Sequence, residues 1–217
     1  MKLSLIIPVL CLFILSYGAV QAMPSLSGPG GLITIPSAYV KTGGVVAPSA
    51  AISDNPQTIT SLNYAFGSSM ELGLQQTEHN GTGTNIKYQL APDKGGAEGP
   101  PATAIGFLDQ RMEHTKSFYG VMSKNLQAQD TVPFILHLGV ISEGSFAGHI
   151  RPIAGFETLL SSQMRLVGEY NGSKRDFNGG VIYNFTQAMG SFIYMMDVEG
   201  SGLNADMVSG FTFNLAF

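Results

Sequence analysis

Cysteine, charge and long apolar runs are all scarce in this sequence. Its single cysteine, Cys11, lies in an apolar stretch close to the amino terminus. Residues 1–22 carry a positive charge at Lys2, then this apolar stretch, then small residues around Ala22, a pattern that predicts a cleaved secretory signal peptide. Leu10 precedes Cys11 where a lipoprotein signal requires a small residue, so we expect no lipid anchor. The secreted chain would then contain no cysteine, which excludes disulfide bonds and thiol chemistry.

Charged residues make up only 12% of the chain, about half of the roughly 25% found in soluble domains. The formal net charge is -4 and no Lys/Arg cluster is present, which argues against a nucleic-acid partner. Hydrophobic residues reach 44%, yet no run beyond residue 22 approaches the ~20 residues of a membrane helix. This composition favours a transmembrane β-barrel, in which one strand face meets lipid and the other meets the lumen. The alternative is a secreted all-β protein with too few surface charges for good solubility.

The last eleven residues of the chain alternate between large apolar and small or polar side chains. In a strand, Phe211, Phe213, Leu215 and Phe217 would share one face. A chain that ends in this way resembles the terminal assembly signal of bacterial outer-membrane β-barrel proteins, which the barrel assembly machinery recognises. An edge strand of an ordinary β-sandwich is the alternative interpretation.

Beyond the signal peptide, the chain divides into a Gly/Pro-rich segment and a series of alternating runs. Residues 23–44 are too rich in Pro and Gly for a regular element, and we expect them at or in the mouth of a barrel formed by residues 45–217. Each later run has about ten residues, the length that a tilted membrane strand requires. We predict an antiparallel barrel of twelve strands, or of ten, at residues 45–53, 57–67, 69–78, 84–91, 101–110, 117–125, 132–142, 150–159, 163–171, 177–186, 190–199 and 206–217.

Charged residues in several of these strands fall opposite the apolar stripe, as a lumen requires. Residues 150–159 do not sort in this way, because Phe156 and Glu157 compete for one face. In residues 190–199, Phe192 and Tyr194 would face lipid. The charged residues could form a polar path for a solute, or could pair with one another and hold the barrel shut; the usual pairing of buried charges favours the second interpretation. The predicted lumenal residues are Glu71, Lys87, Arg165, Glu169 and Asp197.

Five short motifs occur in order along the chain. They are Gly28-Pro29-Gly30-Gly31-Leu32-Ile33-Thr34-Ile35-Pro36-Ser37-Ala38; Ile86-Lys87-Tyr88-Gln89-Leu90; Pro101-Ala102 followed by Ile105-Gly106-Phe107-Leu108-Asp109; Tyr119 with Val121, Ser123 and Lys124; and Gly168-Glu169-Tyr170-Asn171-Gly172 followed by Phe177-Asn178-Gly179-Gly180 and Tyr183. Together they resemble the YjbH-like family of exopolysaccharide-associated outer-membrane β-barrel proteins. The chain is short and corresponds only to the barrel core of that family. The resemblance implies a role in producing or exporting an extracellular polysaccharide, with Lys87, Asp109, Lys124 and Glu169 as candidate lumenal contacts.

An outer-membrane enzyme acting on surface lipid or glycan is an alternative function, and a structural envelope scaffold without transport is another. Of the four histidines, only His137 lies in the middle of a predicted strand, on its lumenal side. Ser123 and Ser142 could supply a nucleophile, but no motif frames either. The histidines and acids lack the spacing of metal ligands.

The sequence therefore favours a non-enzymatic protein of the Gram-negative outer membrane that has no cofactor and no metal. Its expected partners are outer-membrane lipid and the barrel assembly machinery, with a polysaccharide and its export proteins as further partners.

Overall fold

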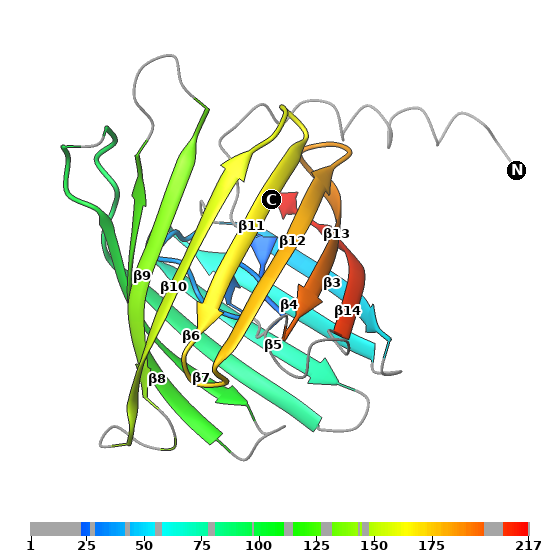
Figure 1. The fold of residues 1–217 in the computed structure, drawn as a ribbon, viewed down its shortest axis with the longest axis horizontal. Coiled ribbons are helices and arrows are strands. Elements are labelled where there is room, and N and C mark those ends of the chain that lie inside the picture. The colour runs from blue at the N-terminus through cyan, green and yellow to red at the C-terminus, as the bar shows by residue number, and fades with distance from the viewer. Residues whose placement is uncertain are drawn as a thin grey trace, which may run out of the picture.

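The computed structural model describes residues 23–26, 29–41, 44–54, 58–77, 81–96, 98–110, 115–126, 132–142, 144, 148–197 and 206–216. Most of them form one antiparallel β-barrel (Figure 1). Its twelve strands are β3 (Val45–Ser53), β4 (Thr58–Phe66), β5 (Met70–Thr77), β6 (Gly81–Ala91), β7 (Ala102–Gln110), β8 (Thr115–Asn125), β9 (Phe134–Ser142), β10 (Ile150–Leu159), β11 (Met164–Asn171), β12 (Asp176–Asn184), β13 (Met189–Met196) and β14 (Asp206–Phe213). The predicted count of twelve is confirmed, and the predicted ranges agree with the strands to within a few residues.

Pairing between the first and last strands closes the barrel. Each strand pairs with the next along the chain, and β14 then pairs with β3, with Gly210 opposite Ala51. A short piece, β15 (Leu215–Ala216), continues after β14 and also pairs with β3. Closure leaves no barrel strand with an unpaired edge. No helix in the described part of the chain is long and apolar enough to cross a membrane.

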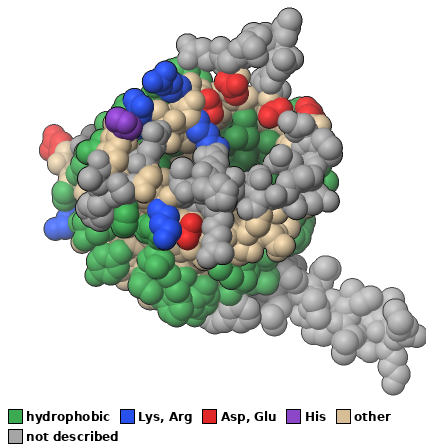
Figure 2. All heavy atoms as spheres, turned by 90° about the horizontal axis from the view of Figure 1, so that it is seen from below, with side chains coloured by type: hydrophobic (Ala, Val, Ile, Leu, Met, Phe, Trp, Pro, Cys, Tyr) green, Lys and Arg blue, Asp and Glu red, His purple; other side chains and the backbone are tan. Residues whose placement is uncertain are grey.

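The outer surface of the barrel is a belt of exposed apolar side chains. Figure 2 shows hydrophobic side chains over the flank of the barrel, while charged side chains gather around the end that faces the viewer. The predicted carboxy-terminal stripe is part of the belt: Phe211 and Phe213 are exposed, and Thr212 between them is buried. Phe217 lies outside the described residues. Other members of the belt are Leu62, Leu74, Ile86, Leu90, Ile105, Met122, Leu138 and Met195.

The predicted faces of β13 are wrong, because Phe192 and Tyr194 point into the barrel rather than towards lipid. Both are buried, whereas Ile193 between them is 56% exposed. Inward-facing glycines on the neighbouring strands make room for the two rings. A Cβ atom added to Gly180 would lie 2.4 Å from the Tyr194 ring, and one added to Gly210 would lie 2.6 Å from the Phe192 ring. Alternation alone could not reveal this, because both faces of the strand are apolar.

The Gly/Pro-rich segment fills the interior of the barrel. We call residues 23–41 the plug, of which 23–26 and 29–41 are described. Its short strands β1 (Met23–Pro24) and β2 (Gly30–Gly31) pair with each other. Its residues Leu32, Ile33 and Ile35 are at most 1% exposed and belong to the hydrophobic core. In Figure 1 the plug, in blue, lies between the front and rear walls. The segment expected at or in the barrel mouth therefore lies inside the barrel.

Candidate functional site

A buried ion pair on β5 and β6 holds one part of the plug. Glu71 and Lys87 face each other across the two strands. Lys87 Nζ lies 3.1 Å from Glu71 Oε2, and both side chains are at most 1% exposed. The Lys87 ammonium also donates to the carbonyls of Gly30, at 2.8 Å, and Tyr39, at 2.7 Å. The Gly30 N–H in turn donates to Glu71 Oε1. Both charges are therefore used to bind plug backbone.

A second carboxylate, that of Glu169 on β11, accepts hydrogen bonds from consecutive backbone N–H groups of the plug. The N–H groups of Ile33, Thr34 and Ile35 donate to it at 2.9, 2.8 and 3.2 Å. The Thr34 hydroxyl at 2.5 Å and the Asn178 amide at 2.9 Å donate to it as well. Successive N–H groups that converge on one anion form a backbone nest. Here the anion belongs to the wall and the nest to the plug.

Further polar contacts hold the plug along its length. The Ala38 N–H donates to Ser123 Oγ at 2.8 Å, and the Ala38 carbonyl accepts from Gln89 at 2.8 Å. Lys41 Nζ donates to Asn214 Oδ1 at 2.6 Å, next to the carboxy terminus. Because these contacts come from several sides of the wall, they hold the plug inside the lumen.

Ser123, His137, Glu157 and Arg165 form a buried row across β8, β9, β10 and β11. Ser123 Oγ lies 2.7 Å from His137 Nδ1, and His137 Nε2 lies 3.3 Å from Glu157 Oε1, an ion-pair distance without the alignment of a good hydrogen bond. Arg165 NH1 donates to Glu157 Oε2 at 2.7 Å. Nucleophile, base and orienting acid are the residue types of a hydrolytic triad. Ser123 is fully buried, however, and its oxygen accepts the Ala38 N–H. In this conformation the row anchors the plug.

The structure places four of the predicted lumenal residues on the inner wall: Glu71, Lys87, Arg165 and Glu169. His137 is also lumenal, as predicted. Glu157 was missed because its strand did not sort into two faces; the structure buries Glu157 and turns Phe156 outward, where its ring lies beside Gly168. The described residues contain no group of three or more His, Asp or Glu side chains placed to hold a metal ion.

Two predicted lumenal contacts lie away from the inner wall. Asp109 follows the buried Leu108, so its side chain lies on the outer side near the end of β7. Lys124 follows the buried Ser123 in the same way and binds a loop at the rim. Asp197 lies just beyond the end of β13, with a positive φ of 55°, and its N–H donates to Asn178 on the inner wall at 3.0 Å. Asp109 and Lys124 were selected by motif resemblance, which does not respect the alternation of side chains along a strand.

Asp93, in the loop between β6 and β7, connects this rim to the plug. Its carboxylate accepts from Lys124 Nζ at 2.8 Å, from the Asn125 N–H at 3.0 Å and from the Tyr39 hydroxyl at 2.9 Å. The Gly95 N–H adds a fourth donor at 3.0 Å. Sequence analysis missed Asp93, although an Asp after Pro and before two Gly residues is a common turn pattern whose side chain binds nearby backbone.

We expect Asp93 to titrate below the ordinary range of an aspartate. Burial raises its pKa, but hydrogen bonds from Lys124, Asn125, Tyr39 and Gly95 outweigh burial and lower it overall. The contact therefore stabilises the fold fully above the ordinary Asp pKa and is lost as the pH falls through the lower folded-state pKa. A carboxyl-carbon NMR titration of Asp93 measures this midpoint. Lys124→Met should move it upward; a wild-type midpoint at or above the ordinary value would contradict the assignment.

Of the comparisons with known proteins, the one with solved structures bears on the fold. No protein-family model and no curated protein matches the sequence. Among solved structures, a KdgM porin in complex with disordered oligogalacturonate is similar with a TM-score of 0.53 and 9% identity, over 79% of this chain and 99% of that chain. A second KdgM porin structure gives a TM-score of 0.52 at 9% identity, again over 79% and 99%. A NanC porin structure gives 0.46 at 11% identity, over 78% and 100%. At 9% identity, the similarity to the two KdgM porin structures shows the fold alone, a twelve-stranded barrel of the kind found in porins.

Proposed function

We propose that this chain is an outer-membrane β-barrel protein of the Gram-negative envelope that takes part in the production or export of an extracellular polysaccharide. The observation that carries the membrane location is that exposed apolar side chains cover the outer face of the barrel, while the buried charges Glu71, Lys87 and Glu169 lie on the inner face. Exposed Leu74 and buried Gln75 are adjacent examples. This division suits a barrel with lipid outside and a polar lumen inside. Outer-membrane lipid and the barrel assembly machinery are the partners that this location implies.

The link to polysaccharide rests on the five motifs and on the chemistry of the inner wall. Several buried polar groups there have no hydrogen-bond partner among the described residues, including the amides of Asn63 and Asn85 and the hydroxyls of Tyr119 and Tyr194. Sugar hydroxyls both donate and accept hydrogen bonds, so amides and phenols of this kind suit a saccharide. The similar KdgM porin was solved with an oligogalacturonate, which supports the same class of solute.

The plug determines whether a solute can pass through the barrel. The plug lies inside the lumen, with Leu32, Ile33 and Ile35 buried in the core, so we propose that the barrel is closed at rest and that the plug moves when a sugar chain passes. The same observation favours a second candidate function, a scaffold that anchors other envelope proteins and transports nothing. Polysaccharide export proteins are the proposed partners in either case.

We expect a strain that lacks this protein to lose extracellular polysaccharide and to accumulate it in the periplasm. Without the barrel, the polysaccharide would not cross the outer membrane, while its synthesis would continue. Both pools should be assayed together, with the wild-type gene restored from a plasmid as the control. Unchanged pools would contradict an export role and favour the scaffold. Outer-membrane fractions should also show the protein shifting in gel mobility on boiling; recovery from the soluble periplasm would contradict the membrane location.

A further inference from the structure

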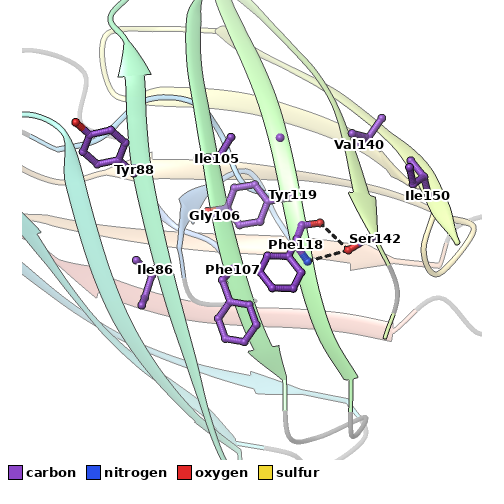
Figure 3. A pocket seen from close by; sticks show the side chains of 11 residues that line it. Ile86, Tyr88, Ile105, Gly106, Phe107, Phe118, Tyr119, Val140, Ser142 and Ile150 are labelled. Atoms are coloured by element: carbon purple, nitrogen blue, oxygen red, sulfur yellow. Dashed lines mark hydrogen bonds between the residues drawn. The ribbon is translucent and has the colours of Figure 1, made fainter. Parts of the chain in front are cut away.

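A groove of about 600 Å³ crosses the outer surface of the barrel over β6 to β10. Figure 3 shows it from close by, with Ile105 and Val140 on either side of β8 and the rings of Phe107 and Phe118 next to each other. These two rings have centroids 5.1 Å apart. The remaining lining is also largely apolar, with three hydroxyl groups: Ile86, Tyr88, Gly106, Tyr119, Gly120, Ser142 and Ile150.

The groove exists because a glycine interrupts a row of outward-facing side chains. Ile105, Gly120 and Val140 lie opposite one another on β7, β8 and β9. Ile105 and Val140 are about half exposed, at 49% and 48%. Between them, a Cβ atom added to Gly120 would meet no heavy atom within 4 Å. The missing side chain therefore leaves a notch between two apolar walls.

Another outward-facing glycine shows that such a notch is not inevitable. A Cβ atom added to Gly168 would lie 2.6 Å from the ring of Phe156, which covers that glycine from the adjacent strand. Gly120 has no covering ring, although Phe118 and Phe107 lie on the neighbouring row. The Ser142 hydroxyl adds no free polar group, because it donates to the Phe118 carbonyl at 3.3 Å and accepts the Phe118 N–H at 3.0 Å.

We propose that the groove binds one acyl chain of a membrane lipid. The inference rests on the proposed membrane location. Gly120 lies midway along β8 (Thr115–Asn125), so the notch lies at half the height of the strand, and at this depth a bilayer presents only hydrocarbon. A volume of about 600 Å³ falls within the roughly 300–1,000 Å³ of small-molecule sites. In a membrane the bound acyl chain gains nothing from burial away from water. What distinguishes it from the surrounding lipid is its ordered packing against the aromatic rings of the groove.

An acyl chain fits the groove better than a second copy of the protein does. A flexible chain can follow a concave surface, whereas two barrels meet through convex walls. The apolar lining points the same way, since Ile86, Ile105 and Val140 offer a neighbouring protein no hydrogen bond. A second copy nevertheless makes a distinct prediction, because filling the groove would then change the oligomeric state.

Filling the groove tests the proposal. Gly120→Phe places a ring in open space, and Gly179→Phe is the matched control: Gly179 is outward-facing on β12, an added Cβ meets nothing closer than 3.9 Å, and it does not line the groove. The full chain is reconstituted in phosphatidylethanolamine vesicles with brominated acyl chains, extracted in detergent and washed stepwise. Native mass spectrometry then counts the lipids that remain bound. We expect wild type and Gly179→Phe to retain one lipid at a wash that removes it from Gly120→Phe.

Three outcomes would overturn the inference. They are equal retention by Gly120→Phe and wild type, no lipid retained by a wild-type chain that has inserted into the vesicles, and a wild-type dimer that Gly120→Phe converts to a monomer. A chain that does not insert at all contradicts the proposed membrane location as well. If the Gly120→Phe variant does not fold, as judged by the loss of its gel-mobility shift on boiling, Gly120→Leu repeats the test with a smaller side chain.

Discussion

Glu169→Ala is expected to release the plug and open the lumen to ions. The substitution removes the acceptor for three consecutive N–H groups, those of Ile33, Thr34 and Ile35. Each buried group left unsatisfied costs about 1–3 kcal/mol, so the docked plug should be weakened by on the order of 3 kcal/mol or more. A change of this size shifts the docked-to-released ratio by about a hundredfold. Planar-bilayer conductance and protease cleavage of the plug within an otherwise folded barrel measure the release.

The control for this variant is Asp206→Ala, which removes an exposed carboxylate at the start of β14. It should leave both conductance and protease resistance unchanged. Glu169→Gln should give an intermediate result, because its amide keeps one acceptor oxygen but turns an NH₂ group towards plug donors. If the Glu169→Ala protein conducts no ions and its plug resists protease, the apolar packing of Leu32, Ile33 and Ile35 suffices to hold the plug.

Lys87→Met is expected to lower the free energy of unfolding by about 3–5 kcal/mol, the usual cost of removing one partner of a buried ion pair. The Glu71 carboxylate would lose its paired cation in a site where it is 0% exposed. The carbonyls of Gly30 and Tyr39 would lose their donor as well. Urea unfolding of the barrel in lipid, followed by the gel-mobility shift, measures the change. Lys116→Met, at an exposed lysine, is the control.

The double variant Glu71→Gln with Lys87→Met separates the charge from the packing. It removes both buried charges, and the glutamine oxygen can still accept the Gly30 N–H. Replacing both members of a buried pair is often close to neutral, so we expect the double variant to regain much of the stability that Lys87→Met loses. A double variant as unstable as the sum of the two single variants would contradict coupling between the residues.

The barrel itself could be predicted from the sequence because each strand alternates between an outer face and an inner face. A side chain on the wrong face is costly, so alternation located all twelve strands and placed Glu71, Lys87, Arg165 and Glu169 on the inner wall. The rule gives no answer where both faces are apolar. In β13 the choice between Phe192 and Ile193 depends on glycines in neighbouring strands, and such pairing is not visible within one strand.

The plug and its docking site were less accessible to sequence reasoning. Pro and Gly predicted irregular structure for residues 23–44, but not which wall residues would bind it. The contact between Ile33 and Glu169 spans 136 positions of the chain, a separation at which no local periodicity carries information. Asp93 lies in a loop, where alternation does not apply, and its role follows only from the approach of Tyr39 and Lys124.

The long separation between the plug and Glu169 also constrains the order of folding. Contacts between distant residues form late, because their loop-closure entropy must be overcome first. The plug precedes the barrel strands in the chain, yet the carboxylate that receives its backbone lies on β11. Until β11 is in place the plug cannot dock, and its apolar residues Leu32, Ile33 and Ile35 remain uncovered. Docking of the plug therefore reports that the wall is nearly complete.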